Sequence, residues 1–312
     1  MDSLTERSIA LLRRDGRASF SDLARQLDTS RMSIANRLNP LFESGALRVF
    51  AAVHPRLIGL TMLAHLSIRV SGPTKHLARS LAQLDSPVFV SESTGKYQII
   101  AELHAESLTE LQRDVHLIRE MPGVIDIDLM LYERILSSLF LGEEPRAISQ
   151  SFDKSDLVLM ELLQRDGRIG YAELGELVGL SASAARSRVA RLIESDAMRI
   201  GVVRGRTELN SELVFGFGFN LSGDQTALVA HLKAHPGIEF LAQTVGRYDL
   251  VATLAFGTQP EFLELFDAVR ELPEVRTAES WIHARISLER FHHSTHRLAQ
   301  IGRTETDPLI IR

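Results

Sequence analysis

The sequence predicts an α+β protein in which two winged-helix-like helix-turn-helix domains alternate with two ferredoxin-like βαββαβ domains. Three observations predict this fold class. Most of the sequence repeats with a constant offset of 151 residues, each copy opens with a helix-turn-helix pattern, and the rest of each copy alternates strand and helix periodicities. Residues 1–142 are called the first half below, and residues 155–290 the second half.

The repeat runs through most of both halves. The segment LLRRDGR at residues 11–17 recurs as LLQRDGR at residues 162–168. The same offset relates GKYQ, starting at Gly95, to GRYD, starting at Gly246, and it relates REMP to RELP further along. A constant offset over so many positions indicates a duplicated unit.

Each half opens with a pattern of three short helices. In the first half a second helix starts near Ser21, Ser30 is placed to cap a third helix, and Gly45 supplies its left-handed end. In the second half a turn at Gly179 and a cap at Ser181 repeat this pattern. Two helices joined by a short turn, the second apolar on one face and basic on the other, are typical of a helix-turn-helix.

The remainder of each half alternates strands with amphipathic helices in the order βαββαβ. Residues 62–70 and 215–221 carry apolar side chains at every second position, and helical spacing follows each of these strands. One face of such a sheet is covered by helices, and the open face is expected to find a partner. The predicted domains are therefore helix-turn-helix 1 (1–50), βαββαβ domain 1 (60–142), a polar linker (143–154), helix-turn-helix 2 (155–201), βαββαβ domain 2 (211–290) and a tail (291–312).

Composition limits the function classes. The 312 residues carry a net charge of −5, and there is no cysteine, which excludes disulfides, thiolate metal sites and a cysteine nucleophile. The N-terminus has no signal-peptide pattern and no apolar run is long enough to cross a bilayer, so we expect a cytoplasmic protein without a membrane partner. Any DNA binding has to be local, because only the surface facing the groove must be positive.

The residues of both patterns resemble the Lrp/AsnC (leucine-responsive, feast/famine) family of transcriptional regulators. The resemblance rests on residues 22–24, 30–45, 173–174 and 180–197, and on the turns at 94–98 and 245–249. It implies an N-terminal domain that reads double-stranded DNA, and a C-terminal domain that pairs with its like and senses an amino acid or a related small molecule. It also implies a homodimer or higher oligomer through the βαββαβ domains, although a duplicated chain already contains two units.

The two halves depart from the family pattern in different ways. Gln98 replaces the aspartate of the turn signature, which the second half keeps as Asp249. Pro40 lies inside the third helix of the first half, where it removes a backbone donor and is expected to kink the helix. Asp196 stands where the first half has Gly45. The halves are therefore expected to differ in role.

The candidate DNA-reading residues lie on the polar face of each third helix. Arginine can pair with guanine and asparagine with adenine, whereas a solvated helix face is the alternative interpretation. Residues 11–49 carry a local net charge of +3 and residues 162–200 carry +1, which favours the first half for DNA binding, although Pro40 argues against it. The candidates are Arg31, Met32, Ser33, Asn36, Arg37, Ser183, Arg186, Ser187, Arg188 and Arg191.

The candidate effector residues lie at the two glycine turns. Asp249 could hold the ammonium group of a ligand, while Gln98 could only form an uncharged hydrogen bond, so the effector site is expected to depend more on the second half. From residue types alone, simple strand connections are the better explanation of these turns, and it is the family resemblance that favours an effector role. The candidates are Thr94, Gly95, Tyr97, Gln98, Gly246, Tyr248 and Asp249. No other cofactor and no metal site is expected, and His292, His293 and His296 are interpreted as part of a surface tail.

Three functions compete. The first is a sequence-specific regulator that responds to a small molecule and has no catalytic activity. The second is an enzyme, because some haem-pathway (sirohaem-type) decarboxylases resemble this family and share a duplicated architecture. Such an enzyme would need histidines converging with Tyr97 and Tyr248, and the sequence places none beside them. The third is an architectural DNA-binding protein without an effector.

Overall fold

The computed structural model describes residues 3–139, 142–144, 152–204 and 213–290. They form two compact units, and each unit combines a stretch from both halves of the chain. Residues 1–58 and 145–209 contribute to the first unit, and residues 59–144 and 210–290 to the second. Most of the predicted linker and the whole predicted tail, with its histidines, lie outside the described residues.

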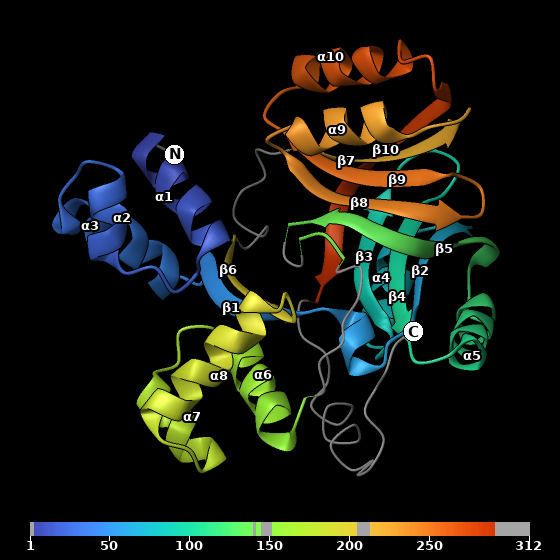
Figure 1. Ribbon diagram of the computed structural model, residues 1–312. Helices are drawn as coiled ribbons and strands as arrows, with labels where there is room; N and C mark the ends of the chain where they lie inside the picture. Colours follow the sequence, from blue (N-terminus) through green and yellow to red (C-terminus); the bar gives the residue numbers. More distant parts are fainter. Residues whose placement is uncertain (1–2, 140–141, 145–151, 205–212, 291–312) are drawn as a thin grey trace. The chain divides into compact units, whose positions relative to one another are not determined.

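The first unit contains two sets of three helices (Figure 1). Ser30 Oγ accepts a hydrogen bond from Ser33 N at 3.0 Å, and Ser181 Oγ accepts one from Ala184 N at 3.2 Å, which confirms both predicted N-caps. The helices are α1 (Ser3–Arg14), α2 (Phe20–Gln26), α3 (Arg31–Glu43), α6 (Lys154–Arg165), α7 (Tyr171–Val178) and α8 (Ala182–Glu194).

The ends of these helices show how the halves have diverged. Gly45 has φ +74°, as predicted, and Asp196 takes the same left-handed conformation at φ +55° without being glycine. The reverse holds at the turn between α2 and α3, where Asp28 has φ +50° and the corresponding residue before α8 is Gly179. Helix α3 continues through Pro40 to Glu43, because a proline in the last turn removes one hydrogen bond without ending the helix.

A two-stranded antiparallel sheet joins the two sets of helices. Strand β1 (Leu47–Val53) pairs with β6 (Met198–Arg204), so the strand after each helix-turn-helix pairs with its counterpart from the other half. A winged helix would instead place a hairpin within one domain. Gly16 N donates to Ile200 O at 2.8 Å and Gly167 N donates to Val49 O at 3.0 Å. A Cβ at either glycine would lie under 3 Å from the Val49 side chain, so this approach requires glycine. A short 3-10 helix (Pro55–Ile58) follows β1.

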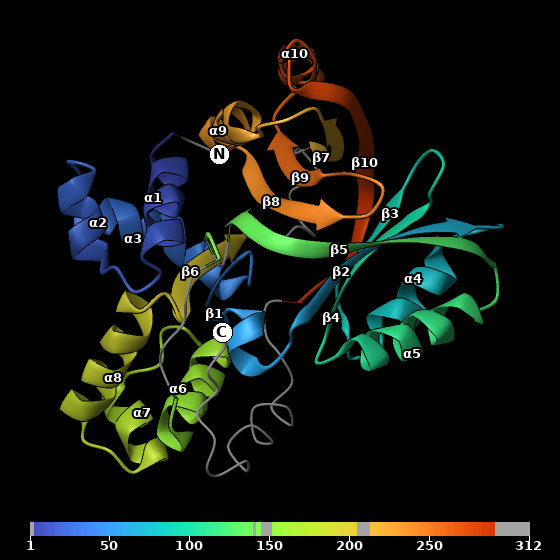
Figure 2. The ribbon, with the colours of Figure 1, turned by 45° about the vertical axis from the view of Figure 1, so that its right-hand side comes forward.

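The second unit is a closed eight-stranded barrel in the order β10-β3-β4-β2-β5-β8-β9-β7, with helices on its outside (Figure 2). Two four-stranded antiparallel sheets join through β5–β8 and β10–β3. The strands are β2 (Met62–Val70), β3 (Pro87–Ser93), β4 (Ile99–Ala105), β5 (Val124–Ser138), β7 (Leu213–Leu221), β8 (Ile238–Val245), β9 (Leu250–Phe256) and β10 (Val275–Glu289). The helices are α4 (Lys75–Ala82), α5 (Leu108–Arg119), α9 (Thr226–Ala234) and α10 (Gln259–Arg270).

Strand alternation divides the second unit into two outer cores and an interior. On β2, Ala64, Leu66 and Ile68 point outward into the core that α4 and α5 cover. On β7, Phe217 and Phe219 point outward into the corresponding core. The open sheet faces predicted from the sequence thus cover one another, and together they form the barrel interior.

Candidate functional site

The helix α3 of the first half presents a mixed polar and apolar surface to solvent. Arg31 and Asn36 are exposed, and Met32 is 72% exposed, the largest value among the exposed large hydrophobic residues. Ser33 and Arg37 are half-buried, and Arg37 Nη1 donates to Ser33 O at 3.1 Å and to Ser33 Oγ at 2.8 Å. Three of the five predicted residues therefore face outward, and the other two also bond to each other along the helix.

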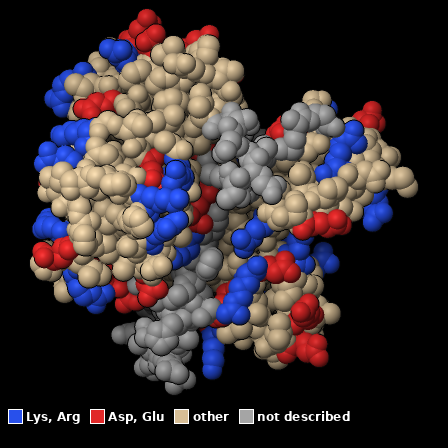
Figure 3. All heavy atoms as spheres, turned by 180° about the vertical axis from the view of Figure 1, so that it is seen from behind, with Lys and Arg blue, Asp and Glu red and all other residues tan. Residues whose placement is uncertain are grey.

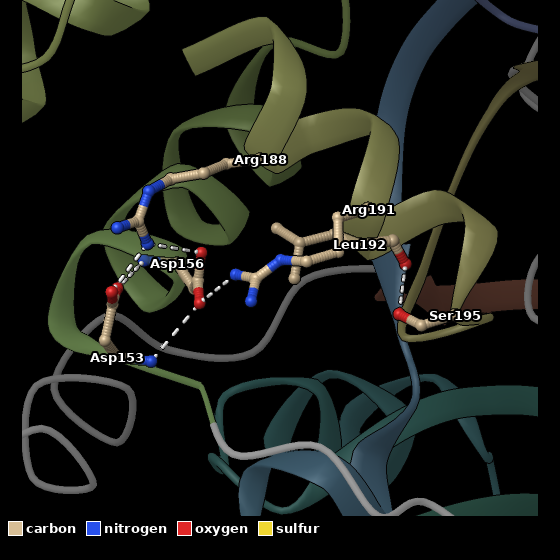
Figure 4. A network of polar contacts seen from close by, with 6 residues as sticks. All are labelled: Asp153, Asp156, Arg188, Arg191, Leu192 and Ser195. Atoms are coloured by element: carbon tan, nitrogen blue, oxygen red, sulfur yellow. Dashed lines mark hydrogen bonds and ion pairs between the residues drawn. The ribbon is translucent and has the colours of Figure 1, made fainter. Parts of the chain in front are cut away.

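The corresponding helix α8 divides its predicted residues in another way. Ser183, Arg186 and Ser187 are exposed. Arg188 and Arg191 instead bond to carboxylates at the start of α6, as Figure 4 shows. Two of the three predicted arginines of this helix are thus bound within the protein.

The carboxylate that holds these arginines is buried. Asp156 is 1% exposed, and it accepts from Arg188 Nη1 at 2.9 Å and from Arg191 Nη2 at 2.5 Å. Asp153 completes the network by accepting from Arg188 at 2.6 Å, and it forms a capping box with Asp156 at the start of α6. The corresponding residue in the first half is Thr5, which carries no charge. This difference between an acidic and an uncharged residue at equivalent positions is the sequence signal that could have revealed the network.

Basic side chains are scattered over the one face of the molecule that Figure 3 draws. On the face drawn in Figure 3, Lys and Arg lie in small clusters interspersed with Asp and Glu. This pattern agrees with the net charge of −5, and a positive surface has to be sought on individual helices. Arg31 on α3 and Arg186 and Arg191 on α8 are the exposed arginines at the positions predicted to read DNA, and Arg191 also bonds to Asp156.

The two turns predicted to bind an effector each contain the same kind of hydrogen bond, from the backbone of a neighbouring strand to the side chain of Gln98 or Asp249. Gln98 Oε1 accepts from Val70 N at 2.8 Å, and Asp249 Oδ2 accepts from Leu221 N at 2.7 Å. Gln98 Nε2 also donates to Gly95 O at 2.6 Å, which a carboxylate cannot do. Both residues therefore hold the turn against the end of a neighbouring strand, and Asp249 additionally brings an exposed negative charge.

The other residues predicted at these turns separate into an exposed and a buried group. Thr94, Gly95 and Gly246 are exposed, whereas the rings of Tyr97 and Tyr248 are buried. The guanidinium of Arg247 lies 4.5 Å from the centroid of each tyrosine ring. Tyr248 Oη donates to Glu279 at 2.6 Å, and burial, together with this hydrogen bond, raises the pKa of Tyr248.

Glycines on β7 make room for the aromatic rings of the interior. A Cβ at Gly216 would lie 2.2 Å from Trp281, and one at Gly218 would lie 2.3 Å from Tyr248. These two rings stack with their centroids 6.2 Å apart. The predicted position of Trp281 in the last strand is confirmed, and its ring packs inside the barrel.

The interior also holds polar residues that the sequence analysis did not single out. His65 Nδ1 lies 3.3 Å from Tyr132 Oη, and Ser91 Oγ lies 2.6 Å from His283 Nδ1. Burial, with a smaller contribution from the charge of Arg247, lowers the pKa of His65 to about 3. The available signal was that these residues occupy every second position of their strands, on the side that faces inward. Apolar residues occupy the same set of positions, so the polar ones do not stand out in the sequence.

Comparisons with known proteins agree with this arrangement. The family model of the AsnC-type helix-turn-helix domain matches residues 152–193. The HTH-type transcriptional regulator FL11 of Pyrococcus abyssi is 30% identical over 126 residues, which cover 40% of this chain and 83% of FL11. FL11 of Pyrococcus horikoshii is 29% identical over the same shares of the two chains.

One solved structure matches nearly the whole chain. The siroheme decarboxylase NirDL aligns with a TM-score of 0.66 and 14% identity over 96% of this chain and 97% of its own. At this identity the match shows the fold alone. None of the helices in the described ranges is long and apolar enough to span a membrane. With an AsnC-type helix-turn-helix and a relative covered over most of its length, the chain belongs to the Lrp/AsnC family of HTH-type transcriptional regulators.

Proposed function

We propose that this regulator is two complete family units in one chain, and that it binds a specific DNA sequence under the control of a small molecule such as an amino acid. The proposal rests on the backbone hydrogen bonds that join the two halves of the chain in the first unit. These bonds recur at positions 151 residues apart. Gly16 and Gly167 donate to β6 and β1 in the same way. Two recognition helices on one pseudo-symmetric scaffold suit an operator with two half-sites.

The first half is proposed as the principal reader. Arg31 and Asn36 offer donors suited to guanine and adenine, and exposed Met32 offers an apolar surface for a thymine methyl group. In the second half Arg186 is exposed and does not bond to Asp156, whereas Arg188 and Arg191 both do. Phosphate contacts from Arg186 would add affinity with little sequence information.

The effector is proposed to bind at the turns, with more weight on the second half. The exposed carboxylate of Asp249 could hold an ammonium group. Gly95 leaves the backbone of the first turn open to a ligand, whereas Gly246 packs against Met130. The barrel already pairs two βαββαβ segments within one chain. One chain is therefore proposed to form the domain pair that two chains form in relatives with a single unit. The effector can change the affinity for DNA only to the extent that it binds one conformation of the protein more tightly than the other.

A second candidate function is a decarboxylase acting on a sirohaem-type tetrapyrrole. Two observations favour it: the fold match to the siroheme decarboxylase NirDL, and the contact of His65 with Tyr132 inside the barrel. The exposed arginines of the recognition helices have no role in such an enzyme. If this function holds, added iron-uroporphyrin would co-elute with the protein in gel filtration, and its visible absorbance band would be shifted from that of the free compound.

Selection of bound sequences from a random DNA pool tests the regulator. We expect an enriched motif with two half-sites, and we expect Arg31→Ala to lose the bases that it reads. Arg186→Ala is the matched control, and it should weaken binding without changing the motif. The absence of any enriched motif, with broad coverage in footprints, would favour the architectural alternative.

A further inference from the structure

A carboxylate without a cationic partner lies on the inner face of the barrel. Glu102 on β4 is the register partner of His65 on β2 and of Phe89 on β3, so the three side chains share one row of the interior. Tyr132 on β5 hydrogen-bonds to Glu102. We call Glu102, His65, Phe89 and Tyr132 the Glu102 cluster.

The charges near Glu102 do not compensate it. The neighbouring charged residue is Glu289 on β10, which repels a carboxylate, and His65 is neutral. Among the described residues, no Lys or Arg forms an ion pair with Glu102. Burial raises its pKa to about 7 even though the hydrogen bond from Tyr132 acts in the opposite direction. A cation beside Glu102 would therefore remove an electrostatic cost.

The three side chains that neighbour Glu102 belong to a series of ring contacts in the barrel interior. The ring of Tyr132 lies 5.2 Å from that of Phe240, and the ring of Phe89 lies 5.3 Å from His283. Trp281 lies 5.9 Å from His65. Aromatic faces attract organic cations, and several of them near a carboxylate make an environment suited to an ammonium group on an apolar body.

The Glu102 cluster retains contact with solvent. Leu63 and Met130 also point inward and are 1% and 0% exposed, as expected of a filled interior. Glu102 and Phe89, by contrast, are only half-buried. Glu102 and Phe89 thus contact solvent near the end of the barrel where β3 begins and β4 ends, and the mouths of barrels of this size are frequent ligand sites.

The fold does not require these polar residues. At an offset of 151, the second half has Thr253, Gly216 and His283 in place of Glu102, His65 and Tyr132. The second half builds the same four strands with Thr253 at the equivalent position, so an acidic residue at this position is specific to the first half. An ionisable group kept in a costly environment on one side only is typical of a functional site.

We propose that the Glu102 cluster binds an organic cation, an amine or quaternary ammonium group carried on an apolar body, inside the barrel. The proposal deepens the effector part of the proposed function, and it names a site other than the two glycine turns. Glu102 provides the countercharge, Tyr132 and His65 orient it, and Phe89, Phe240 and Trp281 contact the apolar body. Binding at neutral pH expels the proton of Glu102 when it is protonated, so affinity rises as the pH increases through its pKa.

Isothermal titration calorimetry with 2-phenylethylamine and with 2-phenylethanol, an uncharged analogue of similar size, tests the proposal on the full chain. We expect the amine to bind and the alcohol to bind at least about tenfold more weakly, since the countercharge contributes only to the amine. Glu102→Gln should reduce amine affinity at least about tenfold, and Thr253→Val, the matched control in the second half, should leave it unchanged. Affinity of the wild type should increase from pH 6 to pH 8, and Glu102→Gln should abolish this increase.

Three outcomes would overturn the proposal: no amine binding at concentrations up to about 10 mM, equal binding of the alcohol, or unchanged affinity in Glu102→Gln. Loss of binding in Asp249→Asn but not in Glu102→Gln would assign the amine to the turn and also reject it. The DNA selection is an independent measurement, so failure of the barrel site and failure of the regulator can be told apart. Circular dichroism of each variant checks that the chain is folded.

Discussion

Arg17 and Arg168 each donate to the backbone of the loop that carries the other. Arg17 donates to Gly167 O and Ile169 O, both at 2.9 Å, and Arg168 donates to Gly16 O at 3.0 Å and Ala18 O at 3.5 Å. These two arginines are 151 residues apart, and each also lies over an aromatic ring of the other half. The exchange connects the two helix-turn-helix segments at the point where β1 meets β6.

Arg17→Ala is expected to lower the free energy of unfolding by about 1–3 kcal/mol, because it leaves two carbonyl acceptors without their charged donor. Arg168→Ala should have a similar or smaller effect, since its second bond is longer. Arg17→Lys should recover only part of the loss, because an ammonium group cannot reproduce the two parallel bonds. Urea denaturation measures all three. A wild-type midpoint in Arg17→Ala would show that the two bonds contribute nothing.

Asp156→Asn is expected to destabilise α6 and α8 by about 1–3 kcal/mol, because it removes the buried negative charge and one of the two oxygens that accept from Arg188 and Arg191, while both arginines remain partly exposed. Asp153→Asn, at an acid that is 55% exposed, is the control and should cost under about 1 kcal/mol. Urea denaturation compares the two variants. If they are equally destabilised, the burial of Asp156 adds nothing to the free energy of unfolding.

The sequence was sufficient for elements that depend on local signals. The caps at Ser30 and Ser181 and the left-handed residue at Gly45 follow from short-range hydrogen bonding and backbone sterics, and the structure confirms them. The period-two pattern of β2 correctly predicted which residues share one face of the sheet, and the structure shows that this face packs against the helices. Such signals need no knowledge of the partner element.

Features that join distant segments were not predictable in the same way. The bonds of Asp156 to Arg188 and Arg191 connect residues more than thirty positions apart on different helices. The pairing of β1 with β6 spans the two halves, so the strand after each helix-turn-helix could only be read as a wing of its own domain. Polar residues inside the barrel, such as His65 and Glu102, look like any alternating strand positions until the sheet closes.

Asp249→Asn is expected to weaken binding of a ligand with an ammonium group at the turn by about tenfold or more, while keeping the turn folded. Asparagine retains the acceptor for Leu221 N and removes only the charge, so it is a cleaner test than alanine. The control is Gln98→Ala, which loses the bond to Val70 N in the first half. Calorimetry with a panel of amino acids measures both. Equal loss in the two variants would contradict a greater role for the second half.

Glu102→Gln is expected to stabilise the protein at pH 8 by about 2 kcal/mol, a value reduced because the side chain is only half-buried. The pKa of Glu102 is raised from 4.5 to about 7, so its contribution to stability is complete below pH 4.5 and is lost as the pH rises through 7. His65, Tyr132 and Glu289 face this carboxylate. Thermal unfolding should show a much larger difference between wild type and variant at pH 8 than at pH 5. An equal difference at both values would mean that the carboxylate is already ionised at pH 5.

Arg31→Ala and Arg186→Ala are expected to differ in how they change DNA binding. An arginine that pairs with a guanine contributes about 1–3 kcal/mol of discrimination, so Arg31→Ala should relax the motif at one position in each site. Loss of a phosphate contact reduces the slope of log affinity against log salt by about 1 without altering the motif, which is the result expected for Arg186→Ala. Titrations of a selected operator and a scrambled duplex at several salt concentrations separate these effects. If Arg186→Ala relaxes the motif and Arg31→Ala does not, α8 is the principal reader, and the more basic first half has another role.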